Sequence, residues 1–420
     1  MKKYTGNNWK LYQGSMLDMA EVIQPNSIDS IVTDPPYELN FMGKGWDNSG
    51  IAFQADTWKR CFDVLKPGGY LLAFGGSRTF HRIAVAIEDA GFEIRDVIMW
   101  LYGSGFPKSL NLGKSVESKL VNGSANTQAF KDLKGTKEEA TSLGLVKRNA
   151  DFGYKSRDYG LDGHERTVEV DYQTDEGQKW DGWGTALKPS YEPIIVARKP
   201  CEGSCTDNVL KYGVGGINID ECRVGNETIK GGTMPKMRAG DCFCDFTVGA
   251  ERLERKGTTG RFPSNTIFTY DETDFEYARY FYCAKASKRD RDEGCDSLED
   301  KMFHRANGGG GLEDDYKFKP VPRKNIHPTV KPTSLMQYLI RLVTPKGGTV
   351  LDPFNGSGST GKAVMYENKD RGAGYKYIGI ELTEEYIPIS IARISYVMGD
   401  EPKEEKPEWE QMTIFDFIKG

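Results

Sequence analysis

The sequence predicts a doubly wound α/β sheet that is interrupted by a loop-rich insertion. In the first hundred residues, short apolar runs typical of buried strands alternate with segments of helical spacing. The same alternation returns from about residue 330, whereas the residues between are polar and weakly periodic. We therefore expect both ends of the chain to contribute strands to one sheet, with helices on its faces.

The expected strands and helices of the first part follow one another closely. Strands are predicted at residues 9–12, 28–32, 70–74 and 92–100, and helices at residues 16–23, 51–65 and 78–90. Gly91 tolerates the left-handed conformation that ends the third helix. An apolar run at residues 194–197 is expected to rejoin the sheet, and the glycine-rich loop at 40–50 is either a lid or a surface turn.

Composition limits the class of protein. The chain has 420 residues, 38% hydrophobic and 28% charged, which suffices for two or three domains. It shows no apolar run of membrane-spanning length and no export leader, so we expect a cytoplasmic protein without membrane contacts. Eight cysteines are too sparse for a disulfide scaffold. The net charge of -5 argues against coating nucleic acid by charge alone, but permits a local basic groove.

A short acidic and aromatic motif, Asp34-Pro35-Pro36-Tyr37, follows the strand predicted at residues 28–32. The two prolines fix φ and lack N–H donors, so neighbouring carbonyls are free to face a ligand. A carboxylate, an outward carbonyl and an aromatic ring together suit the amino group of a nucleobase taken out of its helix. Read alone, the motif fits a rigid proline turn equally well.

A second motif follows the strand predicted at residues 349–351, after a helix at 333–343. It begins at Asp352 and runs through a glycine-rich loop to residue 361. Its glycines let backbone amides approach a ligand, and Ser359 or Thr360 is expected to cap the next helix. That helix terminus favours a carboxylate while Asp352 would pair with a cation, as in the methionine part of S-adenosylmethionine.

Glu381 lies at a position suited to binding a ribose. Glu381 ends the strand predicted at residues 377–381, about twenty residues beyond the glycine loop. In nucleotide-binding α/β sheets a carboxylate at this spacing accepts hydrogen bonds from ribose hydroxyls. Strand, glycine loop, helix, strand and acid in this order is a specific pattern.

Taken together, these motifs resemble the prokaryotic and phage DNA amino-methyltransferases of the circularly permuted β type. In that family the catalytic D-P-P-Y half precedes the cofactor-binding half, with a target-recognition region between them. The residues that match the family's motifs are Asp34, Pro35, Pro36 and Tyr37 (catalytic), Asp352, Phe354, Gly356, Ser357 and Gly358 (cofactor loop), His327, Thr329 and Lys331 (the H-P-T-x-K-P segment), and Glu381 (ribose acid). The family often has Gly-Asp before the first helix, where this chain has Gly14-Ser15, so either Ser15 or Asp18 would meet the cofactor adenine.

The resemblance implies a Rossmann-like, S-adenosylmethionine-dependent methyltransferase sheet with a loop-rich target-recognition region. Double-stranded DNA would be the substrate and S-adenosylhomocysteine the product, in a bacterial or phage-infected cell, as in restriction-modification systems. The implied domains are residues 1–110 (catalytic half), 111–185 (polar insertion), 186–200 (return to the sheet), 201–325 (target recognition), 326–400 (cofactor half) and 401–420 (acidic linker and tail). A monomer or a homodimer is expected.

The implied chemistry is methyl transfer to a flipped base. Asp34 and the Pro35 carbonyl would accept the two N–H groups of the target amine, and Tyr37 would stack on the base. This reaction needs no metal ion. In the resemblance, Asp before Pro-Pro-Tyr goes with adenine N6 and Ser with cytosine N4, so adenine is expected. The alternatives are cytosine N4, an RNA base, or a catalytically dead DNA-binding accessory protein.

Three further features allow two readings each. The cysteines at residues 201–244 could hold zinc, although their spacing and the lack of a nearby histidine favour ordinary thiols. Basic clusters between residues 252 and 324 could contact phosphates or be solvated faces. The tail segment Gln411–Phe415 is similar to peptides that dock on the bacterial sliding clamp, but it could equally cover its own domain.

Overall fold

The computed structural model describes residues 1–39, 45–102, 109–123, 125, 145–147, 168–170, 172–235, 252–254, 257–268, 281–303 and 321–405. The tail motif Gln411–Phe415, Cys242 and Cys244, and residues 40–44 of the predicted lid lie outside these ranges. The chain divides into two compact units, Met1–Gly103 with Ser190–Gly420, and Ser104–Pro189. Within the described ranges, no helix is long and apolar enough to cross a membrane.

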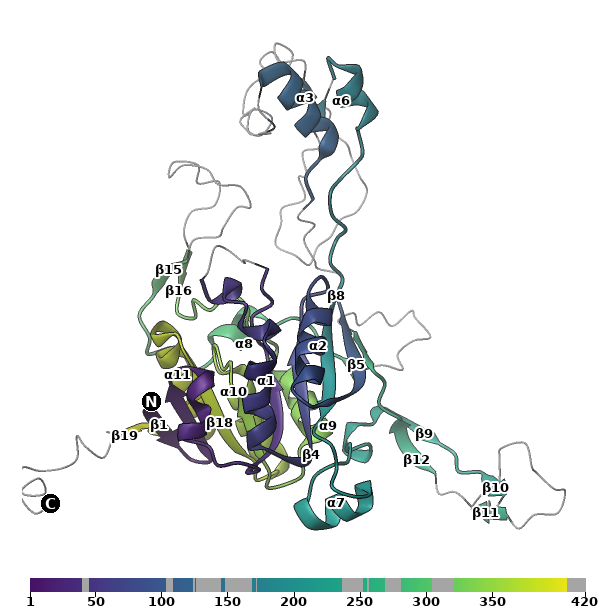
Figure 1. Ribbon diagram of the computed structural model, residues 1–420, viewed down its shortest axis with the longest axis vertical. Coiled ribbons are helices and arrows are strands. Elements are labelled where there is room, and N and C mark those ends of the chain that lie inside the picture. Colours follow the sequence, from purple (N-terminus) through teal and green to yellow (C-terminus); the bar gives the residue numbers. More distant parts are fainter. Residues whose placement is uncertain are drawn as a thin grey trace, which may run out of the picture. The chain divides into compact units, whose positions relative to one another are not determined.

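The first unit is built on an 11-stranded mixed sheet (Figure 1). In spatial order its strands are β14 (Phe281–Tyr282), β13 (Thr266–Phe268), β5 (Glu93–Leu101), β8 (Tyr191–Arg198), β4 (Leu65–Phe74), β3 (Ile28–Thr33), β17 (Thr349–Asp352), β18 (Lys376–Glu381), β2 (Trp9–Gln13), β1 (Lys2–Gly6) and β19 (Lys403–Glu405). The central strands β4, β3, β17, β18 and β2 are parallel to their neighbours in this series. The predicted α/β sheet, built from both ends of the chain, is confirmed.

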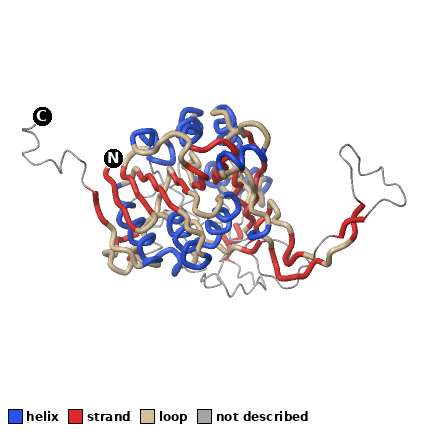
Figure 2. The backbone as a smooth tube through the Cα atoms, turned by 90° about the horizontal axis from the view of Figure 1, so that it is seen from below, coloured by secondary structure: helices blue, strands red, loops and turns tan. Residues whose placement is uncertain are grey.

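Helices cover both faces of this sheet, as Figure 2 shows. One core contains the 3-10 helix η1 (Met16–Glu21), α1 (Ala55–Val64) and α2 (Phe80–Asp89), packed on side chains such as Ile31 and Leu351. The other contains α9 (Thr333–Val343), α10 (Ser359–Arg371) and α11 (Ile387–Met398), packed on Val32 and Val350. Because neighbouring residues of β3 and β17 enter opposite cores, these strands are buried on both sides, as expected of parallel strands.

Two predicted helices differ from the structure, whereas the returning strand joins the sheet as expected. The helix predicted at residues 16–23 is the 3-10 helix η1. The helix expected at residues 51–65 is broken into η4 (Ile51–Phe53) and α1, because Gln54 is extended and the Thr57 hydroxyl bonds the Ile51 carbonyl. The strand β8 runs antiparallel between β4 and β5, so the sheet is mixed. The alternating pattern fixes which residues are strands but not the direction from which an insertion returns.

The stretch expected to be irregular contains short elements. They are α7 (Cys205–Tyr212), η5 (Asp220–Cys222), β9 (Val224–Ile229), β10 (Thr233–Pro235), β11 (Arg252–Glu254), β12 (Thr258–Arg261), α8 (Lys288–Asp292), β15 (Lys301–Phe303) and β16 (Val321–Arg323). Three two-stranded ladders pair β9 with β12, β10 with β11 and β15 with β16. Two short 3-10 helices, η3 (Gly45–Asn48) and η6 (Glu384–Tyr386), complete the unit.

The second unit contains α3 (Leu112–Asn122), α6 (Asp175–Lys179) and the strand pair β6 (Leu145–Lys147) and β7 (Val168–Val170). Glu117 of α3 links α3 to the segment that precedes α6. Its buried carboxylate accepts hydrogen bonds from the Gln173 amide at 2.7 Å and the Thr174 hydroxyl at 2.5 Å. Thr174 in turn caps α6, so a single carboxylate organises this short helical pair.

Candidate active site

The two sequence motifs meet at the carboxyl ends of adjacent strands. β3 and β17 are parallel neighbours; Asp34 directly follows β3 and Asp352 ends β17. The Thr33 hydroxyl donates a 2.7 Å hydrogen bond to Asp352 Oδ1 across 319 residues of chain. The carboxyl ends of parallel strands are where open α/β sheets bind ligands, so this edge is the candidate site.

The two carboxylate oxygens of Asp34 have different surroundings. Lys331 Nζ donates to Asp34 Oδ2 at 2.6 Å and lies 3.4 Å from Glu192 Oε2. Asp34 Oδ1 is buried and accepts no hydrogen bond from the described part of the chain. A buried oxygen without a donor is costly unless a ligand supplies one, so Oδ1 is a candidate acceptor for a ligand donor.

Tyr37 is held by its polar atoms. Its hydroxyl donates to Glu192 Oε2 at 3.0 Å, and its carbonyl accepts from the Thr79 hydroxyl at 2.8 Å. Burial and the nearby carboxylates of Asp34 and Glu192 raise the pKa of Tyr37 well above its ordinary value. The ring therefore stays neutral and fixed, as a stacking surface for a planar group requires.

The charge of Asp34 depends on Lys331. Burial raises the pKa of Asp34, the ammonium of Lys331 opposes this rise, and Glu192 adds to it. Lys331 is itself only 7% exposed. Burial lowers its pKa, but the carboxylates of Asp34 and Glu192 outweigh this effect and raise the pKa above the ordinary value. The ammonium of Lys331 thus counters the burial that favours the neutral acid at Asp34.

Replacing Lys331 with methionine is expected to raise the pKa of Asp34 further. If the reaction needs ionised Asp34, activity should fall about tenfold for each pH unit below the raised pKa and recover as the pH is increased. The measurement is the pH–rate profile, whose acid limb should move to higher pH. Lys66→Met is the matched control, because it removes a similar lysine from Asp29 of the same strand. A lower rate with an unmoved acid limb would contradict this role.

The glycine loop is arranged around Asp352. Its Oδ1 accepts from the Thr33 hydroxyl and the Phe354 amide, and its Oδ2 accepts from the Thr360 hydroxyl at 2.6 Å. Burial raises the pKa of Asp352 to about 6 in spite of these bonds. The expectation that Ser359 or Thr360 caps α10 is wrong. Gly358, in the left-handed region at φ 73°, is the N-cap, and the Thr360 side chain is committed to Asp352.

Glu381 closes the loop from the neighbouring strand. Its carboxylate accepts hydrogen bonds from the amides of Gly356 and Thr383, both at 2.7 Å. Gly356, at φ 53°, lies so close to His327 that a Cβ would be 2.8 Å from Nε2. Burial and the positive charges of Arg393, Arg291 and Lys331 lower the pKa of His327 to about 3, so the imidazole is neutral. The loop is thus shaped by a glycine that fits between an acid and a neutral ring.

Glu381 makes the stability of the fold depend on pH. Burial raises the pKa of Glu381 from 4.5 to about 7. The folded chain thus binds this proton more tightly than the unfolded chain, so the contribution to stability is complete below pH 4.5 and lost as the pH rises through 7. We expect the free energy of unfolding to fall between pH 5 and 8 by up to about 3 kcal/mol from this group. Denaturant titrations of the wild type and Glu381→Gln check this, because the variant should lose that part of the slope.

The structure brings most of the predicted residues together. Lys331, which the resemblance matches to a cofactor segment, places its ammonium on Asp34. Ser15 caps η1, with its hydroxyl accepting from the Leu17 amide, while Gly14 bonds the Glu381 carbonyl. Thr329 is exposed, and Phe354 packs its ring 6.3 Å from Trp58.

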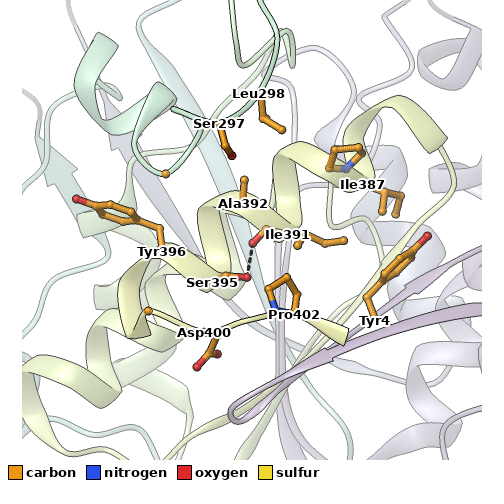
Figure 3. A pocket seen from close by; sticks show the side chains of 13 residues that line it. Tyr4, Ser297, Leu298, Ile387, Ile391, Ala392, Ser395, Tyr396, Asp400 and Pro402 are labelled. Carbon is orange, nitrogen blue, oxygen red and sulfur yellow. Dashed lines mark hydrogen bonds between the residues drawn. The ribbon is translucent and has the colours of Figure 1, made fainter. Parts of the chain in front are cut away.

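Several residues of the site were not predicted. Glu192 joins Tyr37 to Lys331, and Thr33 and Thr360 fix Asp352. Glu192 precedes an apolar strand just as Asp34 follows one, but this signal is too common to select it. A separate cavity of about 650 Å³ is lined by residues of α11 and by Tyr4, Ser297 and Pro402 (Figure 3). It contains none of the residues of the candidate site.

Comparison with known proteins agrees with this geometry. Residues 28–392 match the DNA methylase family N6_N4_Mtase. The chain belongs to this family. It is 33% identical over 96 residues to the type II methyltransferase M.HpaI of Haemophilus parainfluenzae (21% of this chain, 30% of that protein) and 40% identical over 68 residues to the DNA adenine methyltransferase YhdJ of Escherichia coli (16% and 21%). The matched segments thus cover less than a third of these relatives.

Solved structures of low sequence identity align over most of the chain. The PvuII DNA methyltransferase, described as cytosine-N4-specific, aligns with 93% of this chain and 87% of its own, at 14% identity and a TM-score of 0.41. The crystal structure of an M1.HpyAVI–SAM complex aligns with 92% and 99%, at 15% identity and a TM-score of 0.35.

Proposed function

We propose that this protein is a site-specific DNA methyltransferase that transfers a methyl group from S-adenosylmethionine to N6 of a flipped adenine. The observation that carries the proposal is Asp34 Oδ1, a buried acceptor without a donor among the described residues, beside the fixed ring of Tyr37. The glycine loop that begins at Asp352 follows the adjacent strand, β17. An acceptor for an amine, a surface for a base and a cofactor loop at one sheet edge are what base methylation requires.

The cofactor would fit the loop through groups of both charges. Asp352 and the neighbouring Glu381 are buried carboxylates suited to the ammonium and the ribose hydroxyls. Gly356, Ser357 and Gly358 would bring backbone close to the methionine part. When bound, S-adenosylmethionine supplies a methyl group activated by the positive sulfur, and leaves as S-adenosylhomocysteine. Phe354, His327, Thr329 and Ser15 complete the proposed cofactor set.

The chain's residues would then prepare the amine. Asp34 Oδ1 and the Pro35 carbonyl would each accept one N–H of the exocyclic amino group, which increases electron density on nitrogen and fixes its lone pair toward the methyl group. An N–C bond would replace the S–C bond of the cofactor, whose sulfur would keep the electron pair, and the methylated nitrogen would release one proton to water. Lys331 keeps Asp34 ionised, and Tyr37 fixes the plane of the base. Pro36 maintains the turn that presents these atoms.

Adenine is proposed because the motif begins with Asp34; cytosine N4 is the alternative, since either base presents an exocyclic amine. The test is to incubate the purified full chain with methyl-labelled S-adenosylmethionine and unmodified double-stranded DNA, digest the DNA and identify the labelled nucleoside. N6-methyladenine is expected. N4-methylcytosine would replace the adenine assignment, and binding to DNA without transfer would favour an accessory protein. Label appearing only in added RNA would exclude DNA as the substrate.

The remaining assignments are also proposals. Residues 201–325 would read the DNA sequence, and the tail Gln411–Phe415 would dock on a sliding clamp in a bacterial or phage-infected cell. A chain truncated after Lys406 should lose clamp binding in a pull-down while its thermal stability is unchanged. Unchanged clamp binding, or a loss of stability, would overturn the docking role. Gel filtration with light scattering would decide between a monomer and a homodimer.

A further inference from the structure

Four charged side chains meet behind the glycine loop. Lys362 of α10 donates to Asp290 Oδ1 at 2.9 Å and to Glu293 Oε2 at 2.8 Å. Arg393 of α11 lies beside them and donates to the Asp290 carbonyl at 3.3 Å. Asp290 belongs to α8 and Glu293 follows it, so two segments distant in sequence share one charge cluster.

The two cations of the cluster are buried. Lys362 and Arg393 are both 0% exposed, and the partly exposed carboxylates of Asp290 and Glu293 both pair with Lys362. Burying a charge without its partner is strongly unfavourable, so removing one member leaves the others uncompensated. The α8 segment is therefore held against α10 of the cofactor half by ion pairs.

Arg393 connects this cluster to the cofactor loop. Its NH1 group donates to the Ser357 carbonyl at 2.7 Å, to the Ser357 hydroxyl at 3.0 Å and to the Ser359 hydroxyl at 3.1 Å. These two serines flank Gly358, the left-handed residue at which the loop enters α10. Three acceptors on one guanidinium fix both sides of this turn from behind.

The α8 segment is also locked against the helices around it. Asp290 accepts from the amide and hydroxyl of Thr333 at the start of α9. At Gly294 a Cβ would lie 2.7 Å from the Ala392 carbonyl of α11, so this turn approaches the helix as closely as glycine permits. Arg291 donates to the His327 carbonyl at 2.8 Å. The segment thus touches α9, α10, α11 and the residue that abuts Gly356.

We propose that Asp290, Lys362 and Arg393 form a positioning network that sets the shape of the cofactor loop and hence the affinity for S-adenosylmethionine. None of the three is assigned a contact with the cofactor; they act through Ser357 and Ser359. The inference rests on the proposed function and adds to it a link from a segment within residues 201–325 to cofactor binding. Movement of α8 would change the loop, because the buried charges would have to separate.

The test compares Asp290→Asn, Lys362→Met and the double variant in the full-length protein. Calorimetric titration with S-adenosylhomocysteine should show at least about tenfold weaker binding for each single variant, corresponding to the loss of one buried charge–charge bond. The double variant should bind no worse than Lys362→Met, because Glu293 loses its cation in both and the second substitution removes the unpaired charge of Asp290. At saturating cofactor, kcat should stay within about threefold.

Glu367→Gln is the matched control. Glu367 is another buried carboxylate of α10, paired with Arg341 at 2.6 Å, but it does not touch the α8 cluster or the loop. It should lower the melting temperature without changing the affinity for S-adenosylhomocysteine. Equal affinities for the wild type and the Asp290→Asn variant, or an equal loss in the Glu367→Gln control, would overturn the positioning role.

Two outcomes separate this inference from the proposed function. A wild-type chain that fails to bind S-adenosylhomocysteine would refute the proposed function itself, whereas binding that is insensitive to Asp290 refutes only the network. If Asp290→Asn does not fold, Arg393→Lys carries the same test, because lysine keeps the charge but cannot hold Ser357 and Ser359 together. It should also bind about tenfold more weakly, and unchanged affinity would refute the role.

Discussion

Replacing Asp34 with asparagine is expected to slow methyl transfer at least about a hundredfold. Asparagine keeps the size of the side chain, but it can satisfy Lys331 only with its carbonyl oxygen. Its NH2 group then occupies the position of Asp34 Oδ1 and faces the target amine as a donor. The acceptor that should polarise the amine is lost, while the loop around Asp352 is untouched. Cofactor affinity should therefore stay within about threefold of the wild type.

The measurement is the rate of label transfer to DNA at saturating S-adenosylmethionine, together with calorimetric affinity for S-adenosylhomocysteine. Asp29→Asn is the control, since Asp29 lies near the start of the same strand and pairs with Lys66 and the Thr349 amide, at the opposite end from the motif. It should lower thermal stability and leave transfer unchanged. An Asp34→Asn enzyme that transfers at the wild-type rate would show that the carboxylate is not part of the reaction.

Replacing Glu381 with glutamine is expected to weaken cofactor binding at least about tenfold. The carboxylate of Glu381 accepts hydrogen bonds from the amides of Gly356 and Thr383, and in the variant one of these amides would face an NH2 group. The ribose hydroxyls would also lose a charged acceptor. Because the pKa of Glu381 is about 7, wild-type affinity should increase as the pH rises through 7, whereas the variant should show a weaker dependence.

Cofactor titrations at pH 6, 7 and 8 check this expectation. Binding and folding should respond to pH in opposite directions, because the ionised carboxylate that favours the ribose is the form that destabilises the empty fold. Glutamine at Glu367 again serves as the buried control. Equal affinities for the wild type and the Glu381→Gln variant at pH 8 would remove Glu381 from the cofactor site.

Much of this architecture could be predicted from local sequence. Strands such as residues 28–32 can be predicted from apolar runs between turns. The glycine loop can be predicted from the spacing between its glycines and Glu381. The antiparallel direction of β8 could not be predicted, because the insertion before it has no periodic pattern. The contact between Lys331 and Asp34 spans 297 residues, and only the folded sheet brings such residues together.

The same limit explains the wrong helix cap. Ser359 and Thr360 are good capping residues by type, but the N-cap of α10 is the left-handed Gly358. The reason is that the Thr360 hydroxyl bonds Asp352 and the Ser359 hydroxyl bonds Arg393. Tertiary hydrogen bonds here outweigh local preference. Such conflicts between local preference and observed role are expected at functional sites.

The central claim is that two strand ends at one edge of the sheet divide the reaction, with Asp34 after β3 acting on the amine and Glu381 of β18 on the cofactor. The most direct test is single-turnover transfer of a labelled methyl group to DNA, measured at saturating cofactor for the wild type, Asp34→Asn and Glu381→Gln. We predict transfer within about threefold of the wild type for Glu381→Gln and at least about a hundredfold slower for Asp34→Asn. Equal slowing of both variants would contradict the division of roles.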